Sequence, residues 1–230
     1  MLTLEGLRLV LGEFTLAADV TFPAQAITAL IGPSGAGKST LFSAIAGFLK
    51  PAQGQISWDG NDLSDTPPGA RPFSMLFQDN NLFPHLTAVQ NVGLGVQPNL
   101  RLTSDEQKRC EEVLDQVGLA GMGARKPSAL SGGQQSRVAL ARVLVADRPM
   151  VMLDEPFAAL GPALKDEMLD LVKAQLLAAG KTVLMVSHDP SDARRVADYA
   201  ALVADGVVSD PVPTDVLLDN PPPALADYLG

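Results

Sequence analysis

Nine consecutive residues combine three glycines with a lysine and three hydroxyl side chains, in the pattern of a phosphate-binding loop. They are Gly32, Pro33, Ser34, Gly35, Ala36, Gly37, Lys38, Ser39 and Thr40. Glycines let the backbone curl so that several N–H groups point into one concavity, where phosphate oxygens bind. We expect Lys38 to reach the β- and γ-phosphates and the Ser39 hydroxyl to ligate Mg²⁺. The sequence therefore predicts that the chain binds a nucleoside triphosphate.

The residues around this loop place it between a strand and a helix. Residues 26–31 form an apolar run of β character, and residues 40–49 have the spacing of a helix. In that order the positive end of the helix dipole faces the concavity of the loop, which favours a phosphate site. The alternative is a glycine-rich turn with an exposed lysine, and the flanking pattern makes it the weaker interpretation.

Two adjacent carboxylates, Asp154 and Glu155, follow the apolar run 150–153. The carboxyl ends of parallel strands collect at one edge of a sheet, so we expect this pair beside the phosphate loop. Asp154 is expected to act on Mg²⁺, usually through water. Glu155 is expected to be the general base that polarises water toward the γ-phosphate. The alternative is an acidic pair that caps the next helix.

Two further polar residues end predicted strands. Gln78 follows an apolar run and is placed to contact Mg²⁺ or the attacking water. His188 also follows an apolar run, and we expect it to share the crevice edge with Glu155 and to contact the γ-phosphate. A single polar residue after a strand is often only part of a turn, so these two assignments depend on the phosphate loop. The other histidine, His85, has no such placement and is predicted to lie at the surface or at an interface.

A second glycine pair precedes another predicted helix. Ser131 suits the N-cap of that helix, followed by Gly132, Gly133 and Gln134. As pure structure this is a helix cap. Backbone N–H groups at a helix N-terminus also bind phosphate, and the chain already has one complete phosphate loop. A second phosphate surface therefore indicates ATP shared between two subunits.

The elements that must position these residues are strands that alternate with helices. β-Type runs cover residues 3–11, 14–22, 26–31, 55–58, 73–77, 150–153 and 182–186. Helical spacing dominates the middle of the chain and returns between the last two runs. The pattern predicts the α/β class with a largely parallel sheet, as one domain over residues 1–230 with a helical insertion at about 81–146. The proline-rich tail, residues 210–230, is predicted to wrap the surface.

Composition limits the class of protein further. Of the 230 residues 47% are hydrophobic and 19% charged, which supports a full core. The 17 basic and 26 acidic residues give a net charge of −9, which disfavours nucleic acid as a partner. We find no apolar run of the roughly 18 residues that a membrane span needs, and no secretory signal at the start. The single cysteine, Cys110, fits a reducing compartment.

These elements, in this order, resemble the nucleotide-binding subunit of an ATP-binding-cassette (ABC) transporter. The match covers residues 32–40, Gln78, a signature segment at 130–134, the pair 154–155 and His188. The resemblance implies a P-loop NTPase (RecA-like) core, an antiparallel β subdomain and an inserted helical subdomain that carries the signature segment. It also implies an ATPase that forms an ATP-dependent homodimer, with each ATP between one phosphate loop and the opposite signature segment. Closure of that dimer transmits force to membrane permease subunits.

A closer resemblance concerns the transported solute. Residues 71–87 and 90–95 look like the corresponding segment in the ATPase subunits of Gram-negative thiamine importers. That resemblance implies thiamine uptake, a peripheral place at the cytoplasmic face of the inner membrane, and a periplasmic solute-binding protein as an indirect partner. Ferric iron, phosphate or a polyamine is the alternative cargo. A chromosome or repair ATPase is disfavoured, because all elements fit in one compact acidic chain.

Three positions depart from the usual pattern of the family. Gly161 stands where importer ATPases usually have an aspartate that reaches across the dimer, so we expect weaker signalling between the two sites. Leu11 stands near the place of the aromatic residue that stacks on adenine, with Phe14 close by. Gln135 and Ser136 replace the commoner ending of the signature segment, and we expect little effect from them.

Overall fold

The computed structural model describes residues 1–77 and 80–229 of the chain. Its strands are β1 (Leu2–Leu11), β2 (Phe14–Phe22), β3 (Ile27–Ile31), β4 (Gln53–Trp58), β5 (Asn61–Asp62), β6 (Phe73–Leu76), β7 (Met150–Asp154), β8 (Thr182–Val186), β9 (Tyr199–Ala204), β10 (Val207–Val208) and β11 (Val212–Pro213). Its α-helices are α1 (Lys38–Ala46), α2 (Ala88–Gly93), α3 (Ser104–Gln116), α4 (Gly132–Val145), α5 (Pro162–Ala178), α6 (Pro190–Val196), α7 (Thr214–Asp219) and α8 (Pro223–Leu229). Within these described ranges we find no helix with the length and apolar character needed to cross a membrane.

The centre of the sheet is parallel. Strands β9, β3, β8, β7 and β6 are neighbours in that order and run in the same direction. Every residue of β3 and β8 is buried, because helices cover both faces of such a sheet, and both strands therefore read as continuous apolar runs. The predicted α/β class with a largely parallel sheet is confirmed. The carboxyl ends of β3, β7 and β8 consequently meet at one edge.

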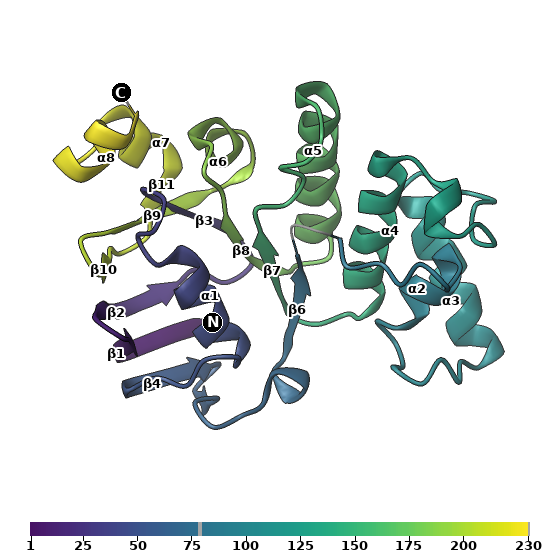
Figure 1. Ribbon diagram of the computed structural model, residues 1–230, viewed down its shortest axis with the longest axis horizontal. Helices are drawn as coiled ribbons and strands as arrows, with labels where there is room; N and C mark the ends of the chain where they lie inside the picture. Colours follow the sequence, from purple (N-terminus) through teal and green to yellow (C-terminus); the bar gives the residue numbers. More distant parts are fainter. Residues whose placement is uncertain (78–79, 230) are drawn as a thin grey trace.

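An antiparallel arm extends the sheet at one end (Figure 1). Strand β1 pairs antiparallel with both β2 and β4, and β5 lies at the outer edge. Buried and exposed residues alternate along β2, as expected for a strand with one covered face. Phe42 and Ile45 of α1 share a buried cluster with Leu4, Leu9 and Leu16 of the arm. The arm therefore supports the helix that follows the phosphate loop.

The first helix is shorter than the sequence pattern predicts. It ends at Ala46, because Gly47 adopts a left-handed backbone with φ of +89° and closes the last turn. The buried guanidinium of Arg71 donates to the carbonyl oxygens of Ala44 (2.8 Å) and Ile45 (2.5 Å) at that end. These bonds satisfy carbonyl groups that a helix end leaves without intrahelical partners. Arg71 thus ties the end of α1 to the segment before β6.

Helices α2, α3 and α4 pack on one another at the end of the molecule away from the antiparallel arm (Figure 1). Each begins with a hydroxyl N-cap in a reciprocal capping box, formed at Thr87, Thr103 and Ser131. Apolar residues of all three helices join the main hydrophobic cluster. Helices therefore occur where the spacing predicted them, and the treatment of residues 81–146 as an inserted unit stays an interpretation.

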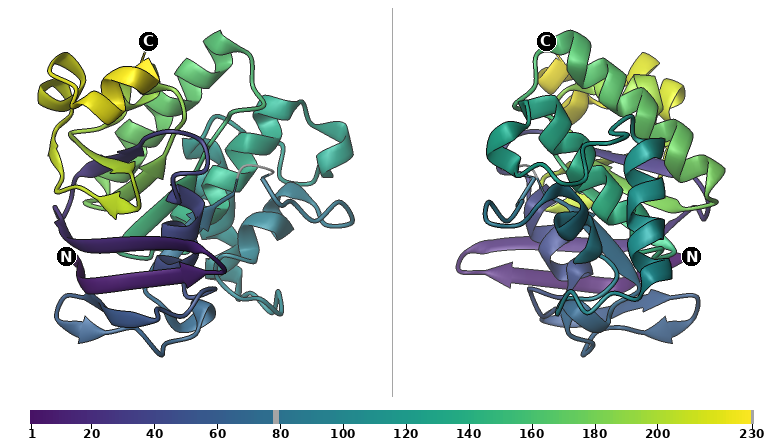
Figure 2. Two further views of the ribbon diagram at one scale, coloured as in Figure 1. Left: turned by 60° about the vertical axis from the view of Figure 1, so that its left-hand side comes forward. Right: turned by 90° about the vertical axis from the view of Figure 1, so that its right-hand side faces the viewer.

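The C-terminal tail does more than wrap the surface. Helix α7 packs beside α6 and β9, and α8 also packs beside β9 (Figure 2). Leu217, Leu218 and Leu225 are buried in the main hydrophobic cluster. The sequence expectation of a surface tail is wrong here, because helices of six and seven residues between prolines carry too little periodicity to be recognised.

Candidate functional site

The phosphate loop joins β3 to α1 at the carboxyl edge of the parallel sheet. Gly32, Gly35 and Gly37 have φ of +147°, +80° and +102°, a region that residues with a Cβ rarely adopt. A Cβ at Gly32 would lie 2.1 Å from the carbonyl oxygen of Val203 on β9. Gly32 therefore allows β9 to pass close to the loop, and Gly35 and Gly37 allow the turn into α1.

Lys38 reaches back across the loop that precedes it. Its Nζ atom donates to the carbonyl oxygens of Gly32 (2.6 Å) and Pro33 (2.9 Å), and the residue is 7% exposed. Burial lowers the pKa of Lys38, and the charge of Glu155 opposes that shift. The ammonium is thus held within the loop, where a triphosphate would supply compensating negative charge.

A cavity of about 220 Å³ opens beside the loop. Its lining residues are Ser34, Gly35, Gly37, Lys38, Ser39, Thr40 and Glu155. The other three loop residues, Gly32, Pro33 and Ala36, belong to the same loop but do not line the cavity. The structure thus brings the predicted phosphate-binding residues and the predicted general base into one space, although they are far apart in the sequence.

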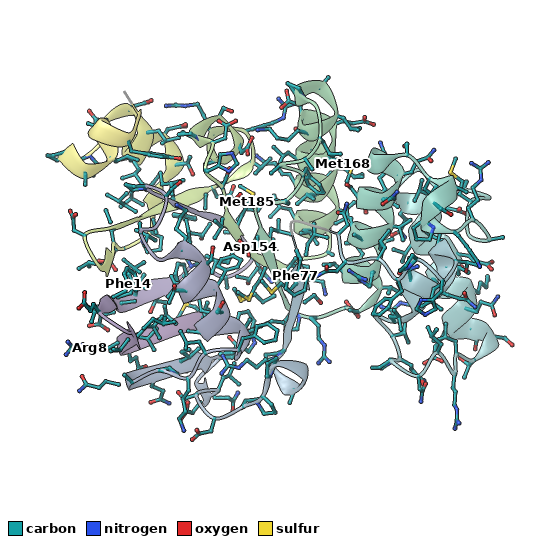
Figure 3. The ribbon with its side chains drawn as sticks, viewed as in Figure 1. Arg8, Phe14, Phe77, Asp154, Met168 and Met185 are labelled. Atoms are coloured by element: carbon teal, nitrogen blue, oxygen red, sulfur yellow. The ribbon has the colours of Figure 1, made fainter. Side chains whose placement is uncertain are left out.

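Asp154 is the last residue of β7 and lies near the middle of the molecule (Figure 3). Burial raises the pKa of Asp154, and the charge of Glu155 raises it further. Glu155 has a left-handed backbone, with φ of +45°, and its N–H donates to the carbonyl oxygen of Val186 at 3.0 Å. That conformation is unfavourable for a residue with a Cβ, and it turns the chain at the end of the strand. The alternative that the pair caps the next helix is wrong, because α5 begins at Pro162 with Gly161 as its N-cap.

His188 meets Glu155 at the same edge. The distance from His188 Nδ1 to Glu155 Oε2 is 3.2 Å. The two residues follow neighbouring parallel strands, β8 and β7. The imidazole is 56% exposed and the Glu155 side chain 28%, and both line a second cavity of about 240 Å³. The structure brings the two residues together, and their catalytic roles stay predictions.

The signature segment lies at the start of α4. Ser131 Oγ accepts from the N–H of Gln134, and Gln134 Oε1 accepts from the N–H of Ser131. Ser131 and Gly132 are exposed, whereas Gly133 is buried, and a Cβ at Gly133 would lie 2.6 Å from a methyl group of Leu164 on α5. No residue of the signature segment is among those that line the cavity at the phosphate loop.

Gln78 lies outside the described residues, so its predicted contact with Mg²⁺ or water is not placed. The segment that follows it is held on α4: Arg142 donates to the carbonyl oxygens of Asn80 and Asn81, both at 2.8 Å. Asn80 Nδ2 also donates to the Ser136 hydroxyl at 3.2 Å. Ser136 is 1% exposed, so this departure from the usual signature ending is a buried link between the two segments.

Sequence reasoning missed two groups that contact the site. Lys165 of α5 bridges Asp189 and Asp192, which follow His188. Tyr228 of α8 donates a hydrogen bond from its hydroxyl to the backbone carbonyl oxygen of His188. A basic residue on a helix and an aromatic residue in a tail are common, and neither carries a spacing signal that could have identified it.

The structure places Phe14 and Leu11, the two residues near the expected adenine-stacking position. The Phe14 side chain, on β2, is labelled in Figure 3. It lies against the phosphate loop, because a Cβ at Gly37 would be 2.6 Å from its Cζ atom. Leu11, at the end of β1, is 47% exposed. Phe14 is therefore the aromatic residue beside the loop, and Leu11 offers only an exposed aliphatic side chain.

The class of the protein follows from a family model described as ABC transporter, which matches residues 17–158. The chain belongs to this family of ATP-binding cassettes, as its motifs predicted. It is 59% identical to the thiamine import ATP-binding protein ThiQ of Ruegeria sp. (strain TM1040), over 230 residues that make up 100% of both chains. It is 58% identical, with the same coverage, to the thiamine import ATP-binding protein ThiQ of Cereibacter sphaeroides.

Solved structures share the fold. The ADP conformation of MJ1267, an ATP-binding cassette of an ABC transporter, is 25% identical with a TM-score of 0.89, over 100% of this chain and 98% of that one. The dimeric post-hydrolysis structure of the ATP-binding cassette MJ0796, bound to ADP and Pi, is 31% identical with a TM-score of 0.77, over 93% of this chain and 99% of that one. The predicted cassette fold is therefore confirmed.

Proposed function

We propose that this chain is the ATP-binding and ATP-hydrolysing subunit of an ABC importer that takes up thiamine. One observation supports thiamine as the substrate: the chain is 59% and 58% identical to two thiamine import ATP-binding proteins over the full length of both chains. The phosphate loop is common to many nucleotide-binding proteins, whereas this identity extends over every other part of the chain. The aligned length includes residues 71–87 and 90–95, the segment whose resemblance to thiamine importers predicted this cargo.

Residues at the carboxyl edge of the sheet have different roles in ATP hydrolysis. The loop backbone and Lys38 bind the phosphates, because N–H dipoles and a buried ammonium attract negative charge. Glu155 lines the same cavity and polarises a water molecule toward the γ-phosphate. His188, whose Nδ1 lies 3.2 Å from Glu155, orients that carboxylate and contacts the γ-phosphate.

Mg²⁺ suits the donors at this edge. Ser39 lines the cavity, and the carboxylate of Asp154 has a pKa raised by burial and by Glu155, a repulsion that a divalent cation would relieve. The residues that the structure describes contain no group of three or more His, Cys, Asp or Glu that could hold a metal ion. That fits Mg²⁺, which usually takes few protein ligands and completes its shell with water and substrate phosphates. The proposed ligands are Ser39, Asp154 and Gln78, and the bound ion would neutralise charge on the phosphates.

A second copy of the chain completes each ATP site. Cassette MJ0796 is dimeric in its post-hydrolysis state, which supports a dimer of this chain. In an ATP-dependent homodimer, the ATP held by one phosphate loop contacts Ser131, Gly132, Gly133 and Gln134 of the other copy. The capping box engages the Gln134 side chain, so this contact comes from the Ser131 hydroxyl and from backbone N–H groups.

The dimer works with membrane permease subunits. It lies peripherally at the cytoplasmic face of the inner membrane, and a periplasmic solute-binding protein acts on it indirectly through the permease. Residues 80–83 lie shortly after Gln78 in the sequence, and the last of them, Phe83, is 47% exposed. An exposed aromatic side chain here supports a permease contact at this face, because aromatic residues are enriched at protein interfaces.

Reconstitution tests the proposal directly. The ATPase subunit is assembled with the permease in vesicles, and ATP hydrolysis is measured with solute-binding protein that is loaded with thiamine or free of it. We expect the thiamine-loaded protein to stimulate hydrolysis. Stimulation by a ferric iron, phosphate or polyamine system instead would overturn the substrate, and no hydrolysis in any assembly would overturn the ATPase assignment.

A further inference from the structure

His188 lies in a short segment whose neighbours on both sides are held by hydrogen bonds. Before it, the Ser187 hydroxyl donates to Asp192 Oδ2 at 2.8 Å. After it, Asp189 accepts from Lys165 Nζ at 2.8 Å, and Lys165 also lies 2.6 Å from Asp192 Oδ1. These contacts restrain residues 187 and 189 through their side chains. The imidazole of His188 is itself 56% exposed, so its own packing restrains it little.

A further contact to this segment comes from the C-terminal helix. The hydroxyl of Tyr228 donates to the backbone carbonyl oxygen of His188. Helix α8 is anchored in the core, because Leu225 is fully buried and its N–H donates to the carbonyl oxygen of Pro222 at 2.8 Å. Tyr228 packs against the same hydrophobic cluster. The hydroxyl is therefore held by a fixed helix.

The electrostatic surroundings keep Tyr228 a donor. Burial raises the pKa of its phenol, and the charges of Asp189 and Glu155 raise it further. A raised pKa means that the hydroxyl stays protonated well above neutral pH. Tyr228 donates to the residue whose imidazole lies 3.2 Å from Glu155, the predicted general base. A tail residue thus lies within the electrostatic field of the catalytic edge.

We propose that Tyr228 is a positioning residue for ATP hydrolysis, which holds the backbone at His188 so that the imidazole stays against Glu155. The proposal rests on the role of His188 given under the proposed function. Loss of the hydroxyl frees the carbonyl group and lets the imidazole move away from Glu155, while the phosphate loop is untouched. We therefore expect turnover to fall and ATP binding to stay the same.

The test replaces Tyr228 by phenylalanine, which keeps the ring and removes only the hydroxyl. In the assembled transporter we expect kcat for Y228F to fall about three- to tenfold, the range set by one hydrogen bond, with KM for ATP unchanged. The matched control is Tyr199→Phe, at the start of β9 and so at the amino edge of the parallel strands, opposite His188. Y199F is expected to keep wild-type kcat. Melting temperatures of both variants check that the fold is intact.

A double-mutant cycle separates this inference from the role of His188. We measure H188A, Y228F and the double variant, and we expect the double variant to be no slower than H188A alone. An unchanged kcat in Y228F with an impaired H188A would overturn the positioning role of Tyr228 and leave the proposed function standing. Normal turnover in H188A would overturn the role of His188 and the inference with it. Additive losses in the double variant would also overturn the inference.

Discussion

The imidazole of His188 and the carboxylate of Glu155 approach to 3.2 Å because they follow the neighbouring parallel strands β8 and β7. The same edge holds the phosphate loop after β3, which pairs with β8 on its other side. Strand order thus brings an imidazole, a carboxylate and the phosphate loop to one edge of the sheet.

Glu155→Gln is expected to abolish most hydrolysis while ATP binding persists. The amide keeps the shape of the side chain but cannot accept a proton from water, and loss of such a base costs about 10²–10⁴-fold in rate. The variant is expected to accumulate an ATP-bound dimer, measurable by size-exclusion chromatography. Glu5→Gln, at an exposed position on β1, is the control and should hydrolyse ATP normally. Brisk hydrolysis by the Glu155 variant would contradict its role as base.

Gly32→Ala is expected to destabilise the protein more than Gly35→Ala. Both positions have positive φ, so an added Cβ costs about 1–2 kcal/mol at each. At Gly32 the Cβ would also lie 2.1 Å from the carbonyl oxygen of Val203, whereas at Gly35 nothing lies within 4 Å. Such overpacking adds about 1–3 kcal/mol. Thermal unfolding of the two variants measures the difference, and equal melting temperatures would refute the close approach of β9.

Gly161→Asp is expected to stabilise α5. Gly161 is the N-cap, no side chain caps the helix there, and a Cβ at this position meets nothing within 4 Å. An aspartate can accept hydrogen bonds from N–H groups of the first turn, and it also restricts the conformations of the unfolded chain. Together these effects raise the free energy of unfolding by about 0.5–1 kcal/mol. Gly161→Ala is the control, since it lacks the capping oxygen and should gain less. We also expect a higher Hill coefficient for ATP hydrolysis in the aspartate variant, and an unchanged coefficient would reject the cross-dimer role.

The free energy of unfolding is expected to fall in acid, in part because the Asp189 carboxylate becomes protonated. Its pKa lies at about 2, below the ordinary value of 3.8, chiefly because Lys165 and Ser191 donate to the ionised carboxylate. A lowered pKa in the folded protein adds stability that is fully present above pH 4 and is lost as the pH falls toward 2. Asp189→Asn should therefore show a smaller loss of stability over that window, measured by denaturant unfolding at several pH values. An identical pH dependence in the variant and the wild type would exclude this contribution.

Local residue patterns predict the parts of the fold that depend on interactions between residues close in the sequence. The buried strands β3, β7 and β8 read as apolar runs, because both faces of a parallel sheet are covered. The phosphate loop and the cap at Ser131 were recognisable because glycine torsions and hydroxyl caps act within a few residues. Residue patterns do not predict the end of α1 at Gly47 or the helices of the tail, because a single left-handed glycine and short apolar segments leave weak signals.

By itself, the sequence determined that this chain is an ATP-binding cassette, because the phosphate loop, the acidic pair and the signature segment each carry their chemistry in consecutive residues. Only the tertiary structure decided which of these groups meet. The order of β3, β8 and β7 places Glu155 in the cavity of the phosphate loop and against His188. The packing of α8 on the core brings Tyr228 to the carbonyl group of His188. Contacts of this kind depend on long-range strand order and helix packing, which no local pattern encodes.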